Sequence, residues 1–386
     1  MCNFGLRLEH INHSKITVQT ENKKIIFLCE NSCCLIKNLY ICILDFIHNS
    51  KNNFQKNIYE VKMTKIKFRR NFQKKKFANT VLIIILLSIG TVKSLSAQPS
   101  FQGSGTEADP YRIYTLADME ELSHNMIYRL NNHLYYNKHY ILMNDITDTL
   151  RVCIGFTCPN GGTSGLHARR RFSGVFNGNN FSINLGIDSC PPIGVGGNAN
   201  ALFAWADSSY VIKNLTVNGF VNGHGVAGAS GIVGVANGDS QSIIFNCINN
   251  SKIIGNTVAG GIVSLTYVGH TIIDNCLNLG SIATTGGSTI TDYNTIGGIV
   301  GGMMGNDKLI IRNSKNSGFV KSNYNSGGIL GGVLNNFFFG ELIIEGCINS
   351  NVVEGGLRAG CIVGNRKGFG TLINNHYDKQ MCGEED

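Results

Sequence analysis

A repeated pattern of glycine and isoleucine dominates the C-terminal part of this 386-residue chain. Its full form is Gly-Gly-Ile-Val-Gly followed by Ile-Ile-x-Asn-Cys-x-Asn, where x is any residue. Copies start at Gly231, Gly261, Gly298 and Gly328, and a degenerate copy starts at Cys361, so the steps are 30, 37, 30 and 33 residues. A period in this range is typical of a solenoid. No single unit is apolar enough to bury its own face, so the units must stack.

Each repeat contains two short runs of β-branched residues, such as Ile232-Val233 and Ile243-Ile244 in the first copy. Gly, Asn and Ser bound these runs, and this pattern indicates strands rather than helices. We therefore predict an all-β fold, a parallel β-helix or β-solenoid of coils of about 30 residues, with a short N-terminal capping helix. The predicted core consists of Ile232, Ile244, Ile262, Ile273, Ile299, Ile311, Ile329, Ile344 and Ile362.

The second run of each repeat predicts a corner in the chain. After the second isoleucine comes a position that is polar in most copies, and then one that is Asn246, Asn275, Asn313 or Gly346. Because Asn and Gly tolerate the left-handed backbone conformation, we expect the chain to bend there. The next residue then points inward, and stacking predicts a ladder of Cys247, Cys276, Ser314 and Cys347 beside a ladder of the corner asparagines. A second file of asparagines, Asn249, Asn278, Asn316 and Asn349, predicts hydrogen bonds from coil to coil.

The pattern GGIVG…NC.N.G.V resembles the GLUG motif of bacterial, Bacteroidetes-type surface proteins, from Gly231 to about Asp378. The segments GSGTEADPYRIYTLADMEEL, YILMNDI and FSGVFNGNNFSI resemble the lead-in common to such proteins. The resemblance implies an exported, adhesin-like β-solenoid. It does not imply a ligand, because the ligands of that family are mostly unknown.

The N-terminal part predicts export. We expect residues 1–62 to be a spurious or disordered extension, and residues 63–97 to be a signal peptide that starts at Met63. A basic region precedes an apolar core, Val81 to Gly90, and small residues follow at 94–98. The apolar core is too short for a membrane-spanning helix, so we expect no integral membrane span in the mature chain. The alternative is a cytoplasmic extension before a signal anchor.

Charge argues against nucleic acid as a partner. Residues 1–97 carry a net charge of +11, and residues 98–386 carry −3, so the overall +8 belongs to the segment that export would remove. A basic footprint is therefore not expected on the mature chain.

Residues 98–150 are expected to cap the first coil. Thr115 and Asp118 form a capping-box-like start, and apolar residues at helical spacing then predict a helix over about 116–130, followed by a strand over 140–143. We interpret residues 151–230 as irregular first coils, in which Leu215 takes the inward cysteine position and Trp205 is a core residue. We interpret the basic run from His167 to Arg171 as a solvated loop.

The cysteines at the start of this region leave three interpretations open. Cys153 and Cys158 could form a disulfide, as expected in an exported protein. They could instead be free buried thiols, or they could hold a metal together with Cys190, although their spacing is looser than in a zinc knuckle.

Two segments are candidate binding loops. The insertion at 284–294, with Thr284, Asp292 and Tyr293, lengthens one coil, and such insertions often lie on a working face. The second candidate is the aromatic run Phe337, Phe338 and Phe339.

The predicted function is an adhesion or binding scaffold without catalysis, with an unidentified host or matrix protein or glycan as its partner and with no cofactor or metal. A polysaccharide-degrading β-helix enzyme is one alternative, and a passive stalk for a missing C-terminal domain is another. An enzyme would need carboxylates that converge in a groove. The repeats instead spread theirs over Asp239, Asp274, Asp292, Asp307, Glu341, Glu345 and Glu354.

Overall fold

The computed structural model describes residues 7–12, 15–20, 23–28, 100–128, 135–155, 171–188, 190, 199–223, 228–284, 294–304, 307–334 and 340–382. The chain divides into two compact units, Met1–Ser94 and Leu95–Asp386. In the first unit, β1 (Arg7–Asn12), β2 (Lys15–Thr20) and β3 (Lys23–Leu28) form an antiparallel sheet. That residues 1–62 are a spurious extension stays a prediction.

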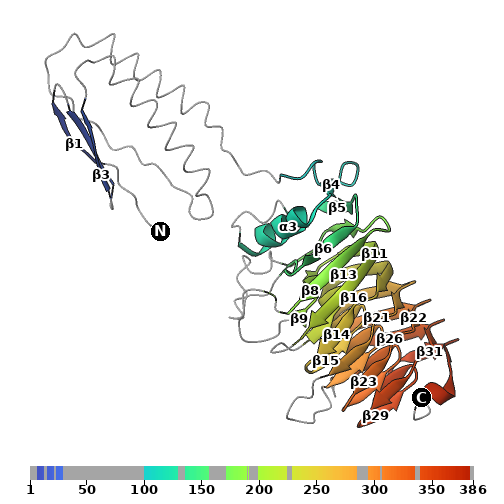
Figure 1. Cartoon of the computed structure of the whole chain (residues 1–386). Helices are drawn as coiled ribbons and strands as arrows, with labels where there is room; N and C mark the ends of the chain where they lie inside the picture. Colours follow the sequence, from blue (N-terminus) through green and yellow to red (C-terminus); the bar gives the residue numbers. More distant parts are fainter. Residues whose placement is uncertain are drawn as a thin grey trace. The chain divides into compact units, whose positions relative to one another are not determined.

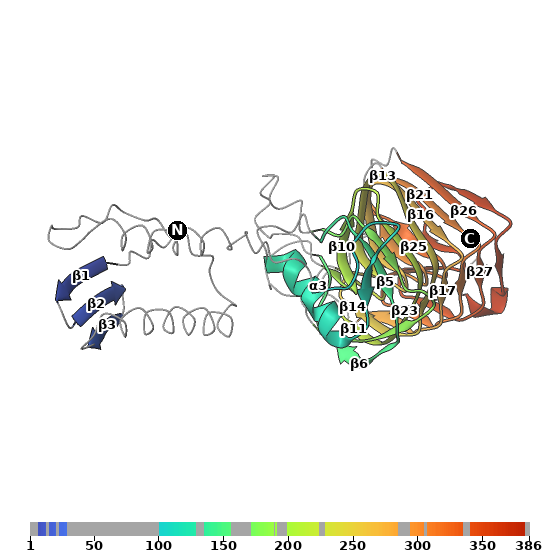
Figure 2. The ribbon, with the colours of Figure 1, turned by 90° about the horizontal axis from the view of Figure 1, so that it is seen from above.

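The second unit is a stack of β coils, that is, a parallel β-solenoid, as the sequence predicts (Figure 1). Strands of successive coils pair in parallel, and the register places Ile212 beside Ile244, Ile244 beside Ile273, and Ile273 beside Ile311. Figure 2 shows that the successive coils largely overlie one another. The side chains of all these isoleucines are fully buried, so the core lies inside the stack.

Each coil runs through the same succession of strands. Two groups of strands lie before the corner. The first group is β10 (Phe203–Asp207), β20 (Val300–Met303), β25 (Leu330–Val333) and β30 (Val363–Asn365). The second group, directly before the corner, is β7 (Val175–Asn177), β21 (Asp307–Arg312), β26 (Glu341–Glu345) and β31 (Thr371–Ile373). In three coils one longer strand spans several of these positions: β11 (Val211–Asn222), β13 (Val233–Asn249) and β16 (Val263–Asp274).

After the corner lie β8 (Ser182–Ile187), β17 (Leu277–Asn278), β22 (Lys315–Asn316), β27 (Ile348–Asn349) and β32 (His376–Tyr377), and then β14 (Lys252–Gly255), β18 (Ile282–Thr284), β23 (Val320–Ser322) and β28 (Val353–Gly355). A separate six-stranded sheet consists of β9 (Ala199–Asn200), β12 (Gly228–Ser230), β15 (Val258–Gly260), β19 (Thr295–Gly297), β24 (Asn325–Gly327) and β29 (Arg358–Gly360).

The predicted corner is confirmed by the backbone angles. Asn246, Asn275 and Asn313 have φ values of 51–53°, and Gly346 has a φ of 60° at the same position. This left-handed residue reverses the usual alternation of side chains, because it turns the chain between two strands. The residue after it therefore points inward, as the second isoleucine before it does.

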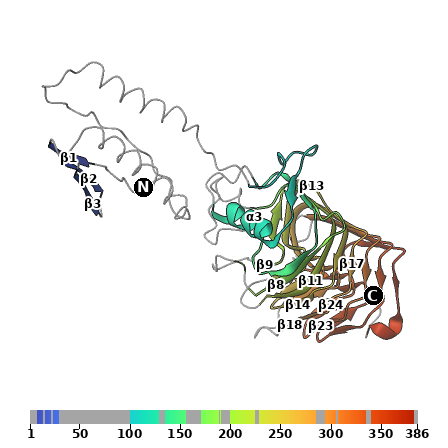
Figure 3. The same ribbon diagram turned by 45° about the horizontal axis from the view of Figure 1, so that its top comes forward.

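The N-terminal end is covered by α3 (Leu116–Tyr128), which confirms the predicted capping helix (Figure 3). Asp118 Oδ2 accepts from the backbone N–H of Thr115 at 2.9 Å, and Thr115 Oγ1 accepts from the N–H of Asp118 at 3.3 Å. Three further strands, β4 (Tyr111–Ile113), β5 (His139–Leu142) and β6 (Ile146–Leu150), form the first part of the stack. The core of this first part contains a cluster of buried aromatic rings: Phe101, Tyr111, Tyr135, Tyr140, Phe172, Phe176 and Phe203.

Candidate binding surface

The strands before the corner carry a charged outer face. One outward file consists of Lys213, Phe245, Asp274, Arg312 and Glu345. Arg312 Nη2 lies 2.9 Å from Asp274 Oδ2, and in the neighbouring file Lys308 Nζ lies 2.8 Å from Glu341 Oε2. Each of these carboxylates is thus paired with a cation of an adjacent coil. On this face, Asp274 and Glu341 each form a cross-coil ion pair. Glu345 lies in the same outward file.

The strands after the corner carry a mostly uncharged outer face, which we call the apolar wall and define by Thr216, Phe220, Ile248, Leu277, Leu279 and Ile348. The register aligns Thr216, Ile248, Leu277, Lys315 and Ile348 in one file, and each member lies between two buried residues. Leu279 is 48% exposed, and Phe220 and Ile348 are each 39% exposed. Large apolar side chains this exposed, in several coils of one wall, are a candidate contact surface.

Besides the exposed charges of Lys252, Lys315, Lys321 and Glu354, this outer face carries small uncharged polar groups. Asn250 Nδ2 donates to Asn218 Oδ1 at 3.0 Å, and the hydroxyls of Ser317 and Ser350 lie 2.9 Å apart. Such groups can donate and accept hydrogen bonds without a net charge. The uncharged part of the face therefore suits a partner that offers apolar surface and neutral polar groups.

The sequence singles out two rows of asparagines. One row is buried behind this wall, and the other lies at the corner. Asn249, Asn278 and Asn316 each donate a side-chain hydrogen bond to the amide oxygen of the next asparagine, at 2.7, 2.7 and 2.9 Å. At the corner, Asn275 donates to Asn246 at 3.3 Å, but Asn313 donates instead to Asp274 Oδ1 at 3.0 Å. The corner asparagines are therefore linked only in part.

Cys247, Cys276, Ser314 and Cys347 are all buried in a single inward file, and the three cysteines are free thiols. Cys276 Sγ donates to the carbonyl of Ile244 at 3.7 Å, and Cys347 Sγ to that of Ile311 at 3.5 Å. Burial raises the pKa of Cys276 well above its ordinary value and raises the pKa of Cys347 to about 11. Thiols held in the protonated form are poor nucleophiles and poor metal ligands, so this file is structural.

Arg171, which the sequence places in a solvated run, is held against the fold. Its Nη1 donates to Asp207 Oδ2 at 2.6 Å, and its guanidinium lies 4.5 Å from the ring centre of Trp205. Asn237 Nδ2 also donates to Asp207, at 2.8 Å. Trp205 is half-buried rather than a full core residue, because its ring forms the platform for this arginine.

The disulfide that involves Cys153 differs from the predicted one. Cys153 is bonded to Cys190, so the predicted pairing with Cys158 is wrong; Cys158 itself lies outside the described residues. The two bonded residues are distant in sequence, but the winding of the first coils brings their Cα atoms to 5.4 Å. A second disulfide, Cys361–Cys382, lies at the C-terminal end.

Of the predicted binding-loop residues, only Thr284 is described, as the partly buried last residue of β18. Asp292, Tyr293, Phe337, Phe338 and Phe339 lie outside the described residues. Across the described part of the chain, no three or more His, Cys, Asp or Glu side chains are grouped as a metal site would require. In that same part, no helix is both long and apolar enough to span a membrane.

The fold thus defines a parallel β-solenoid whose two ends are each held by a disulfide. No family model matches this chain, and no curated protein matches it. Among solved structures, it is similar to a crystal structure of a putative immunoglobulin A1 protease from Bacteroides ovatus, with 16% identity and a TM-score of 0.49, over 72% of this chain and 78% of that one. A likeness this distant says nothing of the activity of this chain.

Proposed function

We propose that this chain is an exported repeat protein that acts as an adhesion or binding scaffold, without catalysis, at the cell surface or outside the cell. The observation that carries the proposal is the apolar wall, where Leu279, Phe220 and Ile348 are exposed on a rigid stack of strands. A solenoid presents such a surface as an extended platform, so that several weak contacts act together.

The two disulfides support export. Disulfides persist in oxidising compartments and are rare where thiols are kept reduced. The charged face supports a role without catalysis, because Asp274 and Glu341 each lie in an ion pair with a cation of a neighbouring coil. The partner would be a host or matrix protein or a glycan.

The test is binding of the full chain to glycan arrays and to immobilised matrix proteins. We expect Phe220→Lys and Leu279→Lys each to weaken binding by about tenfold or more, since a lysine in an apolar contact loses burial and adds an unpaired charge. Tyr267→Lys is the matched control, because Tyr267 is 40% exposed but lies in β16, before the corner.

The outcome separates the alternatives. Equal binding by the wall variants and the control would overturn the wall as the contact surface. No binding by the unaltered chain on any surface would favour a passive stalk. Turnover of a polysaccharide by the unaltered chain would favour an enzyme.

A further inference from the structure

The glycine at the start of each repeat has no room for a side chain. A Cβ atom at Gly298 would lie 2.3 Å from Cγ of Asn316, and one at Gly328 would lie 2.4 Å from Cγ of Asn349. A Cβ at Gly231 would lie 2.4 Å from Oδ1 of Asn249. A Cβ at Gly298 would also lie 2.1 Å from the carbonyl oxygen of Gly328, and one at Gly328 would lie 2.0 Å from that of Cys361. The position is therefore glycine because the asparagine of its own coil and the backbone of the next coil leave no room for a side chain.

In the last coil, both the repeat glycine and the asparagine that packs against it are replaced. The residue in register with Asn349 is Tyr377, and the residue that follows the register pair Gly327–Gly360 is Cys361 instead of glycine. Position 361 can carry a side chain, because its own coil has no asparagine there and no described coil places a backbone carbonyl against it. That side chain forms the disulfide to Cys382.

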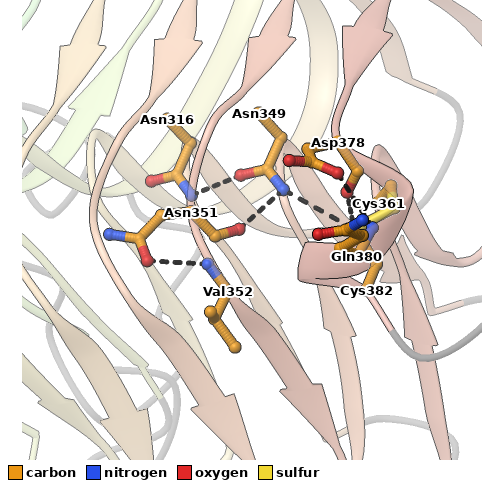
Figure 4. Close-up of a disulfide and its surroundings, with 8 residues drawn as sticks. All are labelled: Asn316, Asn349, Asn351, Val352, Cys361, Asp378, Gln380 and Cys382. Carbon is orange, nitrogen blue, oxygen red and sulfur yellow. Dashed lines mark hydrogen bonds between the residues drawn. A yellow bond between two sulfur atoms is a disulfide. The ribbon is translucent and has the colours of Figure 1, made fainter.

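Cys382 closes the stack at this end (Figure 4). Its backbone forms a parallel bridge with Val353 of β28, on the edge opposite to β23. Its Sγ lies 3.9 Å from Nδ2 of Asn349, where each earlier asparagine of the file finds the amide oxygen of the next. Between Tyr377 and Cys382 the chain turns through the short 3-10 helix η2 (Lys379–Met381), which Asp378 caps by accepting from the N–H of Gln380 at 3.0 Å.

We propose that the Cys361–Cys382 disulfide is a redox-operated latch that holds the segment 378–382 over the open edge of β28. When it is closed, this segment supplies β28 and Asn349 with partners. When it is open, the segment is held by non-covalent contacts, among them the η2 cap, the bridge at Val353 and the weak contact of Asn349 to sulfur. An edge strand without a partner presents free N–H and C=O groups, which a neighbouring strand can pair with.

The opening step is thiol–disulfide exchange with a dithiol reductant. A thiolate of the reductant attacks Sγ of Cys382, which is 8% exposed, whereas Cys361 is 1% exposed. The S–S bond breaks, and the departing electron pair and a proton go to Sγ of Cys361. The second thiol of the reductant then displaces Cys382 as a thiol, and the reductant leaves as its own disulfide.

The test is hydrogen exchange of the full chain, followed by mass spectrometry, with and without dithiothreitol. We expect exchange at Val353–Gly355 and at 376–382 to rise at least tenfold after reduction, while β21 stays unchanged. Reoxidation should restore the slow exchange. Unchanged exchange at β28 would overturn the latch, and a uniform rise over all coils would make the disulfide a staple for the whole stack.

Variants provide the same test without a reductant. The double variant Cys361→Gly with Cys382→Ser restores the glycine of the other repeats, so it should fold and should exchange rapidly at β28 even under oxidising conditions. The variant Cys153→Ser opens the other disulfide and should leave exchange at β28 unchanged. The latch would be wrong if the two variants gave the same exchange at β28.

Discussion

The middle coils of the solenoid and its two ends are stabilised by different kinds of interaction. In the middle, every strand has a neighbour on both sides, so small repeated contacts suffice: asparagine to asparagine, and thiol to carbonyl. At the ends of the described stack, the chain uses α3 with aromatic rings and a disulfide at one end, and η2 with a disulfide at the other. Covalent bonds appear where stacking stops, although the thiols of the middle coils stay unpaired.

The largest effect is expected from the middle, with Asn316→Leu. Asn316 is fully buried, accepts from Asn278 at 2.7 Å and donates to Asn349 at 2.9 Å. Leucine would remove the bond from Asn278, the bond to Asn349 and the bond that Asn316 Oδ1 accepts from the N–H of Gly318. Each buried group that loses its bond costs about 1–3 kcal/mol, so we expect a loss of about 4 kcal/mol in the free energy of unfolding. Urea denaturation followed by circular dichroism measures this loss. The control Asn250→Leu removes an exposed bond and should cost less than about 1 kcal/mol; equal losses would mean that the buried file does not stabilise the middle coils.

Removal of the disulfide at the N-terminal end should lower the free energy of unfolding slightly less than Asn316→Leu does. Replacing Cys153 and Cys190 together by serine opens a bond between residues separated by 37 positions, and a typical loss is about 3 kcal/mol. Trp205 is the only tryptophan of the chain, and it lies in β10, whose neighbour across a bridge is Ile154. Its fluorescence should therefore report unfolding at this end at a lower urea concentration. A midpoint equal to that of the unaltered chain would show that the helix and the aromatic rings hold this end without the covalent bond.

Alkaline pH should weaken the middle through its thiols. The pKa of Cys347 is raised from 9.0 to about 11, so the folded state holds the proton more tightly than the unfolded state does. The stability due to this thiol is then fully present below pH 9 and is lost as the pH rises towards 11, by roughly 2–3 kcal/mol at about 1.36 kcal/mol per pH unit. Urea denaturation at several values of pH, compared with Cys347→Ser, isolates this effect. If the serine variant loses as much stability as the unaltered chain between pH 9 and 11, other groups cause the loss.

The smallest effect is expected for Cys276→Ser. Ser314 already occupies the same file, where its hydroxyl donates to the carbonyl of Arg312 at 2.9 Å. A serine at 276 is small enough to fit and keeps a donor, so we expect a loss below about 1 kcal/mol. Cys276→Leu is the contrast, since extra volume in a packed core costs about 1–3 kcal/mol. Similar thermal midpoints for the two variants would contradict the close packing of this file.

The regular coils could be predicted because each position repeats the same local requirement. The corner asparagines give the bend, and the fixed distance from them to the inward isoleucines and cysteines gives the register. The helix over 116–128 was predictable from Thr115 and Asp118, because capping acts within a few residues. Leu215 in the cysteine position extended the same register to an earlier coil.

The ends could not be predicted in the same way, because their contacts depend on the winding of several coils. The partner of Cys153 is Cys190, which no local spacing reveals. The sequence does contain a signal for the role of Cys361. In the last repeat, cysteine replaces the glycine at position 361 and tyrosine replaces the asparagine at position 377. The apolar wall needed the structure as well, because exposure on a face after the corner depends on which way the bent chain turns.

The buried file from Asn249 to Asn349 has a direction, because every amide donates towards the C-terminal end of the stack. Each asparagine requires only that the following coil present one amide oxygen at the same place. A gene duplication that inserts a whole coil, or a deletion that removes one, would therefore leave the succession of donors and acceptors unbroken. The length of the platform could thus change during evolution while both ends kept their own sequences.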